Sequence, residues 1–580
     1  MRSRWFWSLL LIILVFTLAV RVNLADHRLP QMQVGDENSD LSNAVRMLNG
    51  EWRGFWHTRL GITYFNMLSV GGLFLQQRLS GAVHSLSAFS ELYFAERWRF
   101  TLATRLMMAV LSTATVGVVV WVGRAIKPRV GLLAGVMLSL NGFFLLNSVY
   151  ALPDPVGAFA SALTLLIAVW LWRNPRPIWY FVAGLAMSFT AVAKLNALPI
   201  SIAYLVGHAF ATHRSHPTPR AWAQALFTPK LLLIGVGAII GFLLLDPFAV
   251  LDTAYFLNEL DFFVNFAYGD SNPTLIQQLN AISRNVLEMI RMAWRSLLPL
   301  TLLGGVACWK YRKVAPYWMI LVASVTLFGF TANVTTANYK IFYWIPWLIT
   351  AVLLSAVGVD ALLDWARHPL ARYAVYGLIG VVLAREASYL FYLGKLIDAQ
   401  DTRQLAFAYI QEHWEENAKI MLGDPIAYSV PLQRNLASIE RATALGMAPL
   451  SSWQWYLSLP EADRPTPTYD LYAHEMQKQI ETYADVAQLI DQEQIQYVIE
   501  LSYCETTADH NPASDSAIEY PPLDATLRAS FEQVAVFHPF DSQTCVSEVD
   551  DRNGLSNSYG IPHQVHLGPV VTLYRVGATE

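Results

Sequence analysis

Residues 100–129, FTLATRLMMA VLSTATVGVV VWVGRAIKPR, decide the fold of this chain. The first part, residues 100–122, is predominantly apolar and long enough to cross the roughly 30 Å hydrocarbon core of a bilayer as a helix. The turn that follows, residues 123–129, carries three basic side chains. Lys and Arg gather on the cytoplasmic side of membrane proteins, so this helix is predicted to run inward.

The whole chain has the composition of a membrane protein. Of its 580 residues, 54% are hydrophobic and 14% are charged, whereas a soluble domain has roughly 25% charged residues. The net charge of -4 is small, and the sequence has no basic stripe or aromatic platform of the kind that binds nucleic acid. We therefore predict a polytopic membrane protein without a nucleic-acid partner.

Apolar runs of this kind recur through the first two thirds of the chain. About eleven spans are predicted, and the loops that the alternation places inside are rich in Lys and Arg. A cleaved signal peptide is the alternative for the first run, but the residues after it make a poor cleavage site, and an uncleaved helix is favoured. The predicted spans cover residues 5–20, 100–122, 130–146, 156–172, 178–193, 195–210, 231–245, 287–306, 317–330, 341–357 and 373–393.

The composition changes after about residue 395, where polar residues increase and apolar runs shorten to strand length. Strands are predicted at 418–422, 496–501 and 570–576, with helices at 403–414 and 474–489 between them. Strands that alternate with helices indicate an α/β domain. The predicted fold is thus a membrane all-α domain at 1–395 and a C-terminal extracytoplasmic α/β domain at 396–580.

The first outer loop, residues 26–100, carries the adjacent acids Asp36 and Glu37. A carboxylate at a membrane surface is suited to remove a proton from an acceptor hydroxyl or amine, and the alternative is an ordinary solvated acidic loop. A calcium loop beginning at Asp36 is disfavoured, because Leu41 stands where glycine is required and Met47 where glutamate is required.

Two further charged residues fall on the same predicted side as Asp36. Asp154 lies between two prolines, where it also suits the N-cap of the next helix. Lys194 lies between two apolar spans, where a cation is expensive and usually functional. The alternative for Lys194 is that its ammonium snorkels to the interface. The functional interpretation is a contact to the phosphate of a lipid-linked sugar.

Several weaker candidates complete the predicted site. Arg105 and Lys340 are candidates for binding phosphate, and Arg59, His57 and Tyr343 for binding substrate. No Cys/His spacing typical of zinc occurs in the sequence, so no metal ligand is assigned.

Cys504 and Cys545 both belong to the predicted outer domain. They pair as a disulfide or remain two separate thiols, since spacing alone fixes no connectivity.

Seven pieces, taken in order, carry a resemblance to a known family. They are 35–37, 98–105, 150–155, 193–198, 246–252, 343–347 and 401–403. Together they resemble the C-type (GT-C) integral-membrane glycosyltransferases, nearest the protein O-mannosyltransferase and aminoarabinose-transferase branch. Two features depart from that pattern: Lys340 stands where the family often has Arg, and the C-terminal domain is not the β-trefoil of eukaryotic O-mannosyltransferases.

The resemblance implies an enzyme that moves a sugar, with inversion, from a polyprenyl-phosphate donor to an extracytoplasmic acceptor that is a lipid, a glycan or a protein. It implies that Asp36 activates the acceptor with support from Glu37, that Asp154 shapes the site, and that Lys194 and Arg105 hold the donor phosphate. It implies no metal or other cofactor.

Two alternatives remain open at this point. One is a metal-dependent oligosaccharide transferase or polymerase that uses a diphosphate carrier. The other is a lipid-sugar transporter or flippase, for which inverted repeats and helices broken at the midplane are typical. No such repeat is evident in the sequence.

Overall fold

The structure is a computed structural model, and it describes residues 3–29, 35–51, 59–212, 220, 224, 227–268, 273–290, 297–334, 341–422, 430–444, 451–472, 486–502, 525–544 and 564–577. His57, Lys340, Cys504 and Cys545 lie outside the described residues, and Asp36 is described in its backbone alone.

The chain divides into two compact units. The first contains Met1–Asp26, Asp36–Leu75 and Phe100–Phe391, and the second contains His27–Gly35, Gln76–Arg99 and Tyr392–Glu580. The domain boundary predicted at residue 395 stays a prediction.

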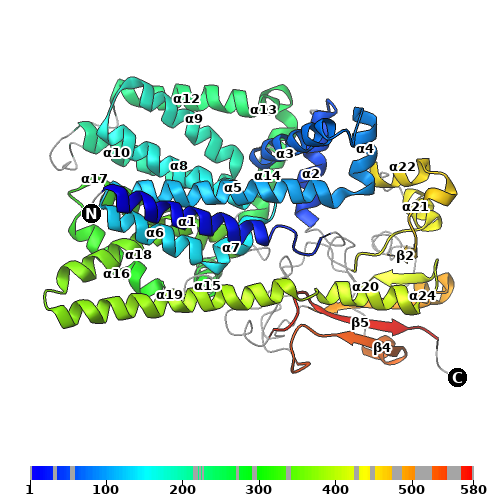
Figure 1. Cartoon of the computed structure of the whole chain (residues 1–580). Helices are drawn as coiled ribbons and strands as arrows, with labels where there is room; N and C mark the ends of the chain where they lie inside the picture. The colour runs from blue at the N-terminus through cyan, green and yellow to red at the C-terminus, as the bar shows by residue number, and fades with distance from the viewer. Residues whose placement is uncertain are drawn as a thin grey trace. The chain divides into compact units, whose positions relative to one another are not determined.

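The described residues of the first unit form helices joined by short turns, and the long helices lie side by side (Figure 1). Helices α2, α3, α5 and α19 also contribute residues to the second unit. The helices are α1 (Ser3–Asn23), α2 (Gly35–Leu48), α3 (Leu60–Leu79), α5 (Arg97–Arg124), α6 (Pro128–Leu140), α7 (Gly142–Val149), α8 (Pro153–Arg173), α9 (Pro177–Ala193), η2 (Leu195–Ser201), α10 (Ile202–Thr212), α12 (Pro229–Leu245), α13 (Phe248–Leu251), α14 (Thr253–Tyr268), α15 (Leu275–Met289), α16 (Leu298–Lys310), α17 (Ala315–Ala332), η4 (Ile341–Trp344), α18 (Ile345–Trp365) and α19 (Pro369–Asp398).

The predicted membrane character is confirmed. Among the described residues, seven helices are long and apolar enough to cross a bilayer, and the bent pair α6–α7 makes an eighth. Three shorter apolar helices, α9, α12 and α16, accompany them. The chain is therefore an integral membrane protein.

Two predicted spans differ in detail from the structure. The run 130–146 is bent by 65° between α6 and α7, where Asn141 accepts a hydrogen bond from the Phe144 N–H and so caps the second helix. The run 287–306 begins in α15 and continues in α16, with residues 291–296 outside the described residues. Helix α3 is not among the helices long and apolar enough to cross a bilayer, and no predicted span covers it either.

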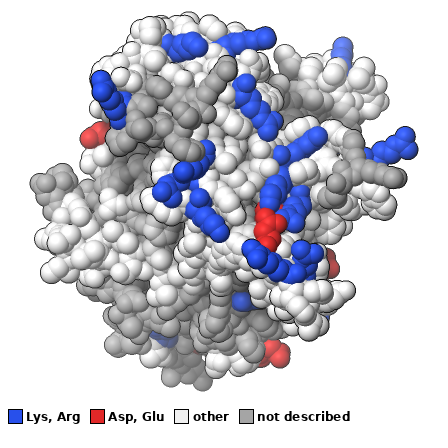
Figure 2. Space-filling view, turned by 90° about the vertical axis from the view of Figure 1, so that its left-hand side faces the viewer, with Lys and Arg blue, Asp and Glu red and all other residues white. Residues whose placement is uncertain are grey.

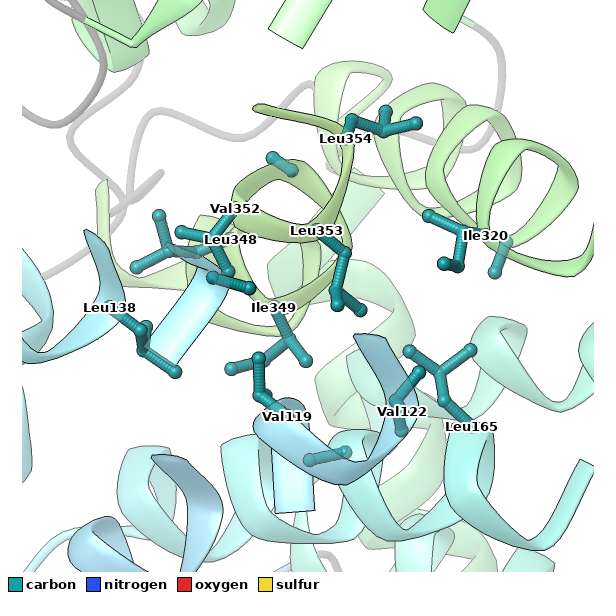
Figure 3. Close-up of a cluster of buried hydrophobic side chains, with 14 of the residues drawn as sticks. Val119, Val122, Leu138, Leu165, Ile320, Leu348, Ile349, Val352, Leu353 and Leu354 are labelled. Carbon is teal, nitrogen blue, oxygen red and sulfur yellow. The ribbon is translucent and has the colours of Figure 1, made fainter. Parts of the chain in front are cut away.

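Helix α18 lies at the centre of the first unit. In the most apolar 18-residue stretch of η4 and α18, 94% of the residues are buried, so protein covers this stretch on nearly every side. A helix buried in this way is apolar all round. Figure 3 shows Leu348, Ile349 and Leu353 of α18 among side chains from neighbouring helices, such as Val119 of α5 and Leu165 of α8.

Close helix packing at α18 depends on glycine. A Cβ atom added to Gly304 of α16 would collide with the backbone of Leu354, and one added to Gly358 of α18 would collide with the backbone of Leu300. Small residues that let backbones approach closely are the usual means of joining helices in membranes.

One end of the first unit is basic. Contacts join its turns: Lys127 and Arg129 form ion pairs with Asp360 and Asp364, and Arg173 donates to the Ala125 carbonyl. Figure 2 views the molecule from this side, where Lys and Arg side chains outnumber acidic ones. We call it the basic end, and it comprises Arg124, Lys127, Arg129, Arg173, Arg176, Lys230, Lys310, Arg312, Lys313, Arg367 and Arg372.

The second unit is built on a five-stranded sheet with the order β2-β1-β3-β5-β4. The pairs β1–β2 and β1–β3 are parallel, whereas β3–β5 and β4–β5 are antiparallel. The elements are α4 (Leu86–Ala95), α20 (Thr402–His413), β1 (Lys419–Leu422), α21 (Leu436–Ala444), α22 (Ser451–Ser458), η5 (Glu461–Asp463), β2 (Asp470–Tyr472), α24 (Val486–Glu493), β3 (Tyr497–Ser502), α25 (Ala525–Ala529), β4 (Glu532–Phe537) and β5 (Val570–Arg575).

The sheet of the second unit is covered by helices on both faces. Ile420 and Leu422 of β1 pack in one cluster with Ile410 of α20, while Met421 between them packs in another with Leu489 of α24. This alternation follows from the two-residue period of a strand. The predicted strands correspond to β1, β3 and β5, and the predicted C-terminal α/β organisation is confirmed.

Candidate active site

Lys194 marks a break between two apolar helices. Helix α9 ends at Ala193, Lys194 has extended backbone angles (φ -167°, ψ 112°), and η2 begins at Leu195. The Lys194 ammonium forms an ion pair with the carboxylate of Asp154, in the first turn of α8. The side chains of Lys194 and Asp154 are 12% and 2% exposed, so the two predicted residues meet in a nearly buried place.

Two aromatic rings flank the same ammonium. The Nζ atom of Lys194 lies 5.1 Å from the ring centre of Phe342 and 5.6 Å from that of Tyr343, both in η4. The side-chain amide of Asn196 donates a hydrogen bond of 3.1 Å to the Tyr343 carbonyl and ties η2 to η4. Aromatic faces attract a cation within about 6 Å, so the ammonium is held by a carboxylate and two rings.

Glu37 and Arg105 form a second, deeper ion pair. The Arg105 guanidinium donates to both carboxylate oxygens of Glu37 at 2.9 and 2.7 Å, and both side chains are 1% exposed. Arg105 also donates to the Ala25 carbonyl at 3.2 Å and lies over the ring of Tyr150 at 5.1 Å. The planar guanidinium fork matches a carboxylate in this two-bond geometry.

The Glu37 carboxylate also accepts a hydrogen bond of 2.8 Å from the Ala151 N–H. One carboxylate thus joins α2, α5 and the loop that leads into α8. Ala151 is three residues before Asp154, so their Cα atoms lie no more than about 11 Å apart. The pairs Glu37–Arg105 and Asp154–Lys194 therefore belong to one region, which we call the paired site. The predicted roles of Glu37 and of Arg105 at phosphate stay predictions.

Removing one partner of the deeper pair is expected to destabilise the protein strongly. Glu37→Gln or Arg105→Met leaves a buried charge without its partner, which lowers the free energy of unfolding by about 3–5 kcal/mol. The double variant E37Q/R105M removes both charges and should recover part of the loss.

Unfolding of the detergent-solubilised protein measures this difference. Arg575→Met is the control, because Arg575 and Glu532 form an ion pair with both side chains about half exposed, and such pairs contribute about 0–1 kcal/mol. If the control and the buried variants lose the same stability, the buried pair does not have the structural role described here.

Asp36 lies in the first turn of α2, directly before Glu37. Its Cα atom is therefore about 3.8 Å from that of the anchored Glu37. Arg59 donates a 2.9 Å hydrogen bond to Asp40, whose side chain is fully buried. Residues four apart share a helix face, so Arg59 contacts α2 on the face that also carries Asp36. The substrate-binding role predicted for Arg59 stays a prediction.

The paired site is about one bilayer thickness from the basic end. Arg105 precedes Arg124 by nineteen residues in α5, and Asp154 precedes Arg173 by nineteen residues in α8. At 1.5 Å per residue, each separation is about 28 Å along the helix. The two helices run in the same direction, so both acid–base pairs lie at the end opposite the basic turns.

Arg21 is a buried arginine that is not among the predicted site residues. Its side chain is fully buried in α1, where Nε donates to the Ser148 hydroxyl at 2.9 Å and the guanidinium lies over the Phe144 ring at 5.1 Å. An arginine at the end of an apolar span is costly to bury, and this cost indicates a functional residue.

Among the residues that the structure describes, no three His, Cys, Asp or Glu side chains are grouped so as to hold a metal ion.

Comparison with known proteins finds similar solved structures at low sequence identity. The sequence matches no family model and no curated protein. One similar solved structure is the Archaeoglobus fulgidus oligosaccharyltransferase tethered to an acceptor peptide, with 11% identity, a TM-score of 0.44 and coverage of 86% of this chain and 69% of that chain.

Two other similar structures are also transferases by name. ArnT from Cupriavidus metallidurans, bound to undecaprenyl phosphate, has 14% identity, a TM-score of 0.42 and coverage of 71% of this chain and 72% of that one. The arabinofuranosyltransferase AftD from Mycobacteria has 15% identity and a TM-score of 0.41, and the similarity covers all of this chain but 40% of that one. The function of this chain is therefore argued from its own residues.

Proposed function

We propose that this chain is an integral-membrane glycosyltransferase that moves a sugar from a polyprenyl-phosphate carrier to an extracytoplasmic lipid, glycan or protein, with inversion. The observation that supports it most is the place of Lys194. A nearly buried ammonium lies at a helix break, beside a carboxylate and two aromatic rings, about one bilayer thickness from the basic end. A lipid phosphate anchored in the membrane presents its charge at such a depth.

In this proposal, Asp36 and the residues of the paired site each have a separate role in the reaction. Asp36 takes the proton from the acceptor nucleophile as the nucleophile attacks the anomeric carbon. The bond from that carbon to the phosphate oxygen breaks, and the polyprenyl phosphate leaves with the electron pair. Lys194 neutralises the charge that develops on the phosphate. Asp154 holds the ammonium of Lys194 until phosphate arrives.

Glu37 supports Asp36 in this proposal through its fixed position. Its carboxylate is held by Arg105 and by the Ala151 N–H, so the first turn of α2 is anchored. Arg105 contributes through this anchoring and through the field of its guanidinium, while Lys340 and His57 stay candidates for phosphate and acceptor contacts. Tyr343 is a candidate to contact the sugar, because its ring already lies beside Lys194.

The proposed orientation follows from the basic end. Lys and Arg in short loops remain cytoplasmic, so the basic end faces the cytoplasm and the paired site faces outward. The part of the chain after residue 395 is then an extracytoplasmic α/β domain, and residues 1–395 form the catalytic membrane domain.

Transfer by the purified full-length chain tests the proposal. The protein is incubated with a polyprenyl-phosphate sugar labelled in the sugar, together with lipid, glycan and protein fractions from the host envelope, and mass spectrometry follows the label. We expect label to move to an acceptor, in the presence or absence of a chelator. Transfer only from a polyprenyl-diphosphate donor, abolished by chelator, would instead identify a metal-dependent oligosaccharide transferase. Movement of the intact lipid-sugar across a vesicle bilayer without transfer would identify a flippase.

A further inference from the structure

The side chain of Lys194 lies across α8 at a glycine. A Cβ atom added to Gly157 would lie 2.9 Å from Cβ of Lys194, 3.2 Å from Cδ and 3.6 Å from Cγ. Carbon atoms in favourable contact are about 3.5–4.0 Å apart. The stem of the lysine therefore occupies the space that any other residue at position 157 would need.

Gly157 and Asp154 act on the same lysine from one helix face. They are three residues apart in α8, so they are neighbours on its surface. Asp154 holds the ammonium, and the gap at Gly157 admits the carbon chain that leads to it. Lys194 Cγ and Cδ are able to move by side-chain rotation, whereas Cβ is fixed to the backbone at the end of α9. A methyl group at Gly157 therefore forces a shift of that backbone, of α8, or of both.

Two explanations for this glycine that do not involve Lys194, helix propensity and backbone packing, are less consistent with the structure. Helix propensity does not explain it, because glycine inside a helix is about 1 kcal/mol less favourable than alanine. Backbone-to-backbone packing accounts for Gly184, where the nearest atoms belong to the backbone of α12. At Gly157, the three nearest heavy atoms all belong to the side chain of Lys194.

We propose that Gly157 is a positioning residue, whose missing side chain lets Lys194 lie along α8 and places its ammonium on Asp154 for the donor phosphate. The contact between Gly157 and Lys194 is independent of the enzyme's activity, while the consequence for phosphate rests on the proposed function.

Gly157→Ala tests the functional part in the full-length enzyme. We expect KM for the polyprenyl-phosphate sugar to rise about tenfold and kcat to fall as well, because the displaced lysine both binds the donor phosphate and neutralises the charge that develops on it, whereas KM for the acceptor should stay unchanged. Gly305→Ala is the matched control, since Gly305 lies inside α16 with no atom within 4 Å of its added Cβ. The control should leave KM unchanged and should not lower the melting temperature, since alanine is the more favourable residue in a helix.

A double-mutant cycle measured by thermal unfolding tests the contact itself. Gly157→Ala is expected to lower the Tm when Lys194 is present and to leave it unchanged or raised when Lys194 is replaced by glycine. If G157A does not fold alone, the combination with Lys194→Gly should restore a folded protein, and failure of that rescue overturns the proposal.

The two experiments distinguish failure of the proposed role of Gly157 from failure of the proposed phosphate role of Lys194. Equal Tm changes in both backgrounds overturn the role of Gly157 and leave the proposed transferase activity standing. Coupling in the Tm without any change in KM overturns the phosphate role of Lys194, and the functional part of the inference is then overturned with it.

Discussion

Lys194→Met is expected to reduce sugar transfer about 100- to 1,000-fold, the effect typical of removing one group that stabilises developing charge in a transition state. Methionine keeps most of the carbon chain that lies along α8 at Gly157 and removes only the ammonium. The leaving phosphate then loses its cation, while Asp154 loses its ion-pair partner. Lys194→Arg keeps the charge in a larger group and should retain part of the activity.

Single-turnover transfer from a polyprenyl-phosphate sugar measures this effect, and binding of the polyprenyl-phosphate product measures the affinity. Lys230→Met is the control, because Lys230 is an exposed residue at the start of α12, in the basic end. The assignment of Lys194 fails if Lys194→Met transfers sugar at the rate of this control.

The helical part of the fold was predictable because each span is a long apolar run, and every second turn between the runs is basic. The prediction of one straight helix is wrong where a turn-forming dipeptide lies inside an apolar run. Asn141–Gly142 is a dipeptide typical of turns, and it divides the predicted span 130–146 into two helices bent by 65°. A hydropathy window averages over such a pair and reports one straight helix.

The sheet of the second unit was predictable in part. Strands β1, β3 and β5 are short apolar runs that were recognised as strands. Strand β2 has only three residues, too few to show a period. Strand β4 begins with Glu and Gln, and most of its residues are at least partly exposed. Neither has enough buried apolar residues to be distinguished in sequence from a loop.

The side of the membrane shared by Asp154 and Lys194 was predictable from the alternation of spans, but their contact was not. It depends on how the first turn of α8 meets the end of α9, which is set by packing rather than by either segment. The partner of Arg105 was hidden in the same way, because Glu37 is 68 residues away in sequence. A cation beside an apolar run is predicted to contact phosphate because a charge there is expensive and usually functional. The structure shows that an acid contacts each of these two cations.

Asp36→Asn is expected to lower turnover about 100- to 10,000-fold, the range by which a positioned general base accelerates reactions, while binding of the donor stays unchanged. Asparagine has nearly the same shape as aspartate but does not accept the acceptor's proton. The neighbouring anchor, in which Glu37 is held by Arg105 and Ala151, remains intact in this variant. The melting temperature should therefore equal that of the unmodified protein.

The comparison with Glu37→Gln makes this prediction specific, because two adjacent acids are assigned opposite effects. Asp36→Asn should lower the rate of sugar transfer and leave the melting temperature unchanged. Glu37→Gln should lower the free energy of unfolding, because it breaks a buried ion pair. Both are measured by single-turnover transfer, donor binding and thermal unfolding on the same preparations. If Asp36→Asn turns over within threefold of the unmodified enzyme, or if its donor affinity falls in parallel with its rate, Asp36 is not the base, and the proton must be taken by another group at the paired site.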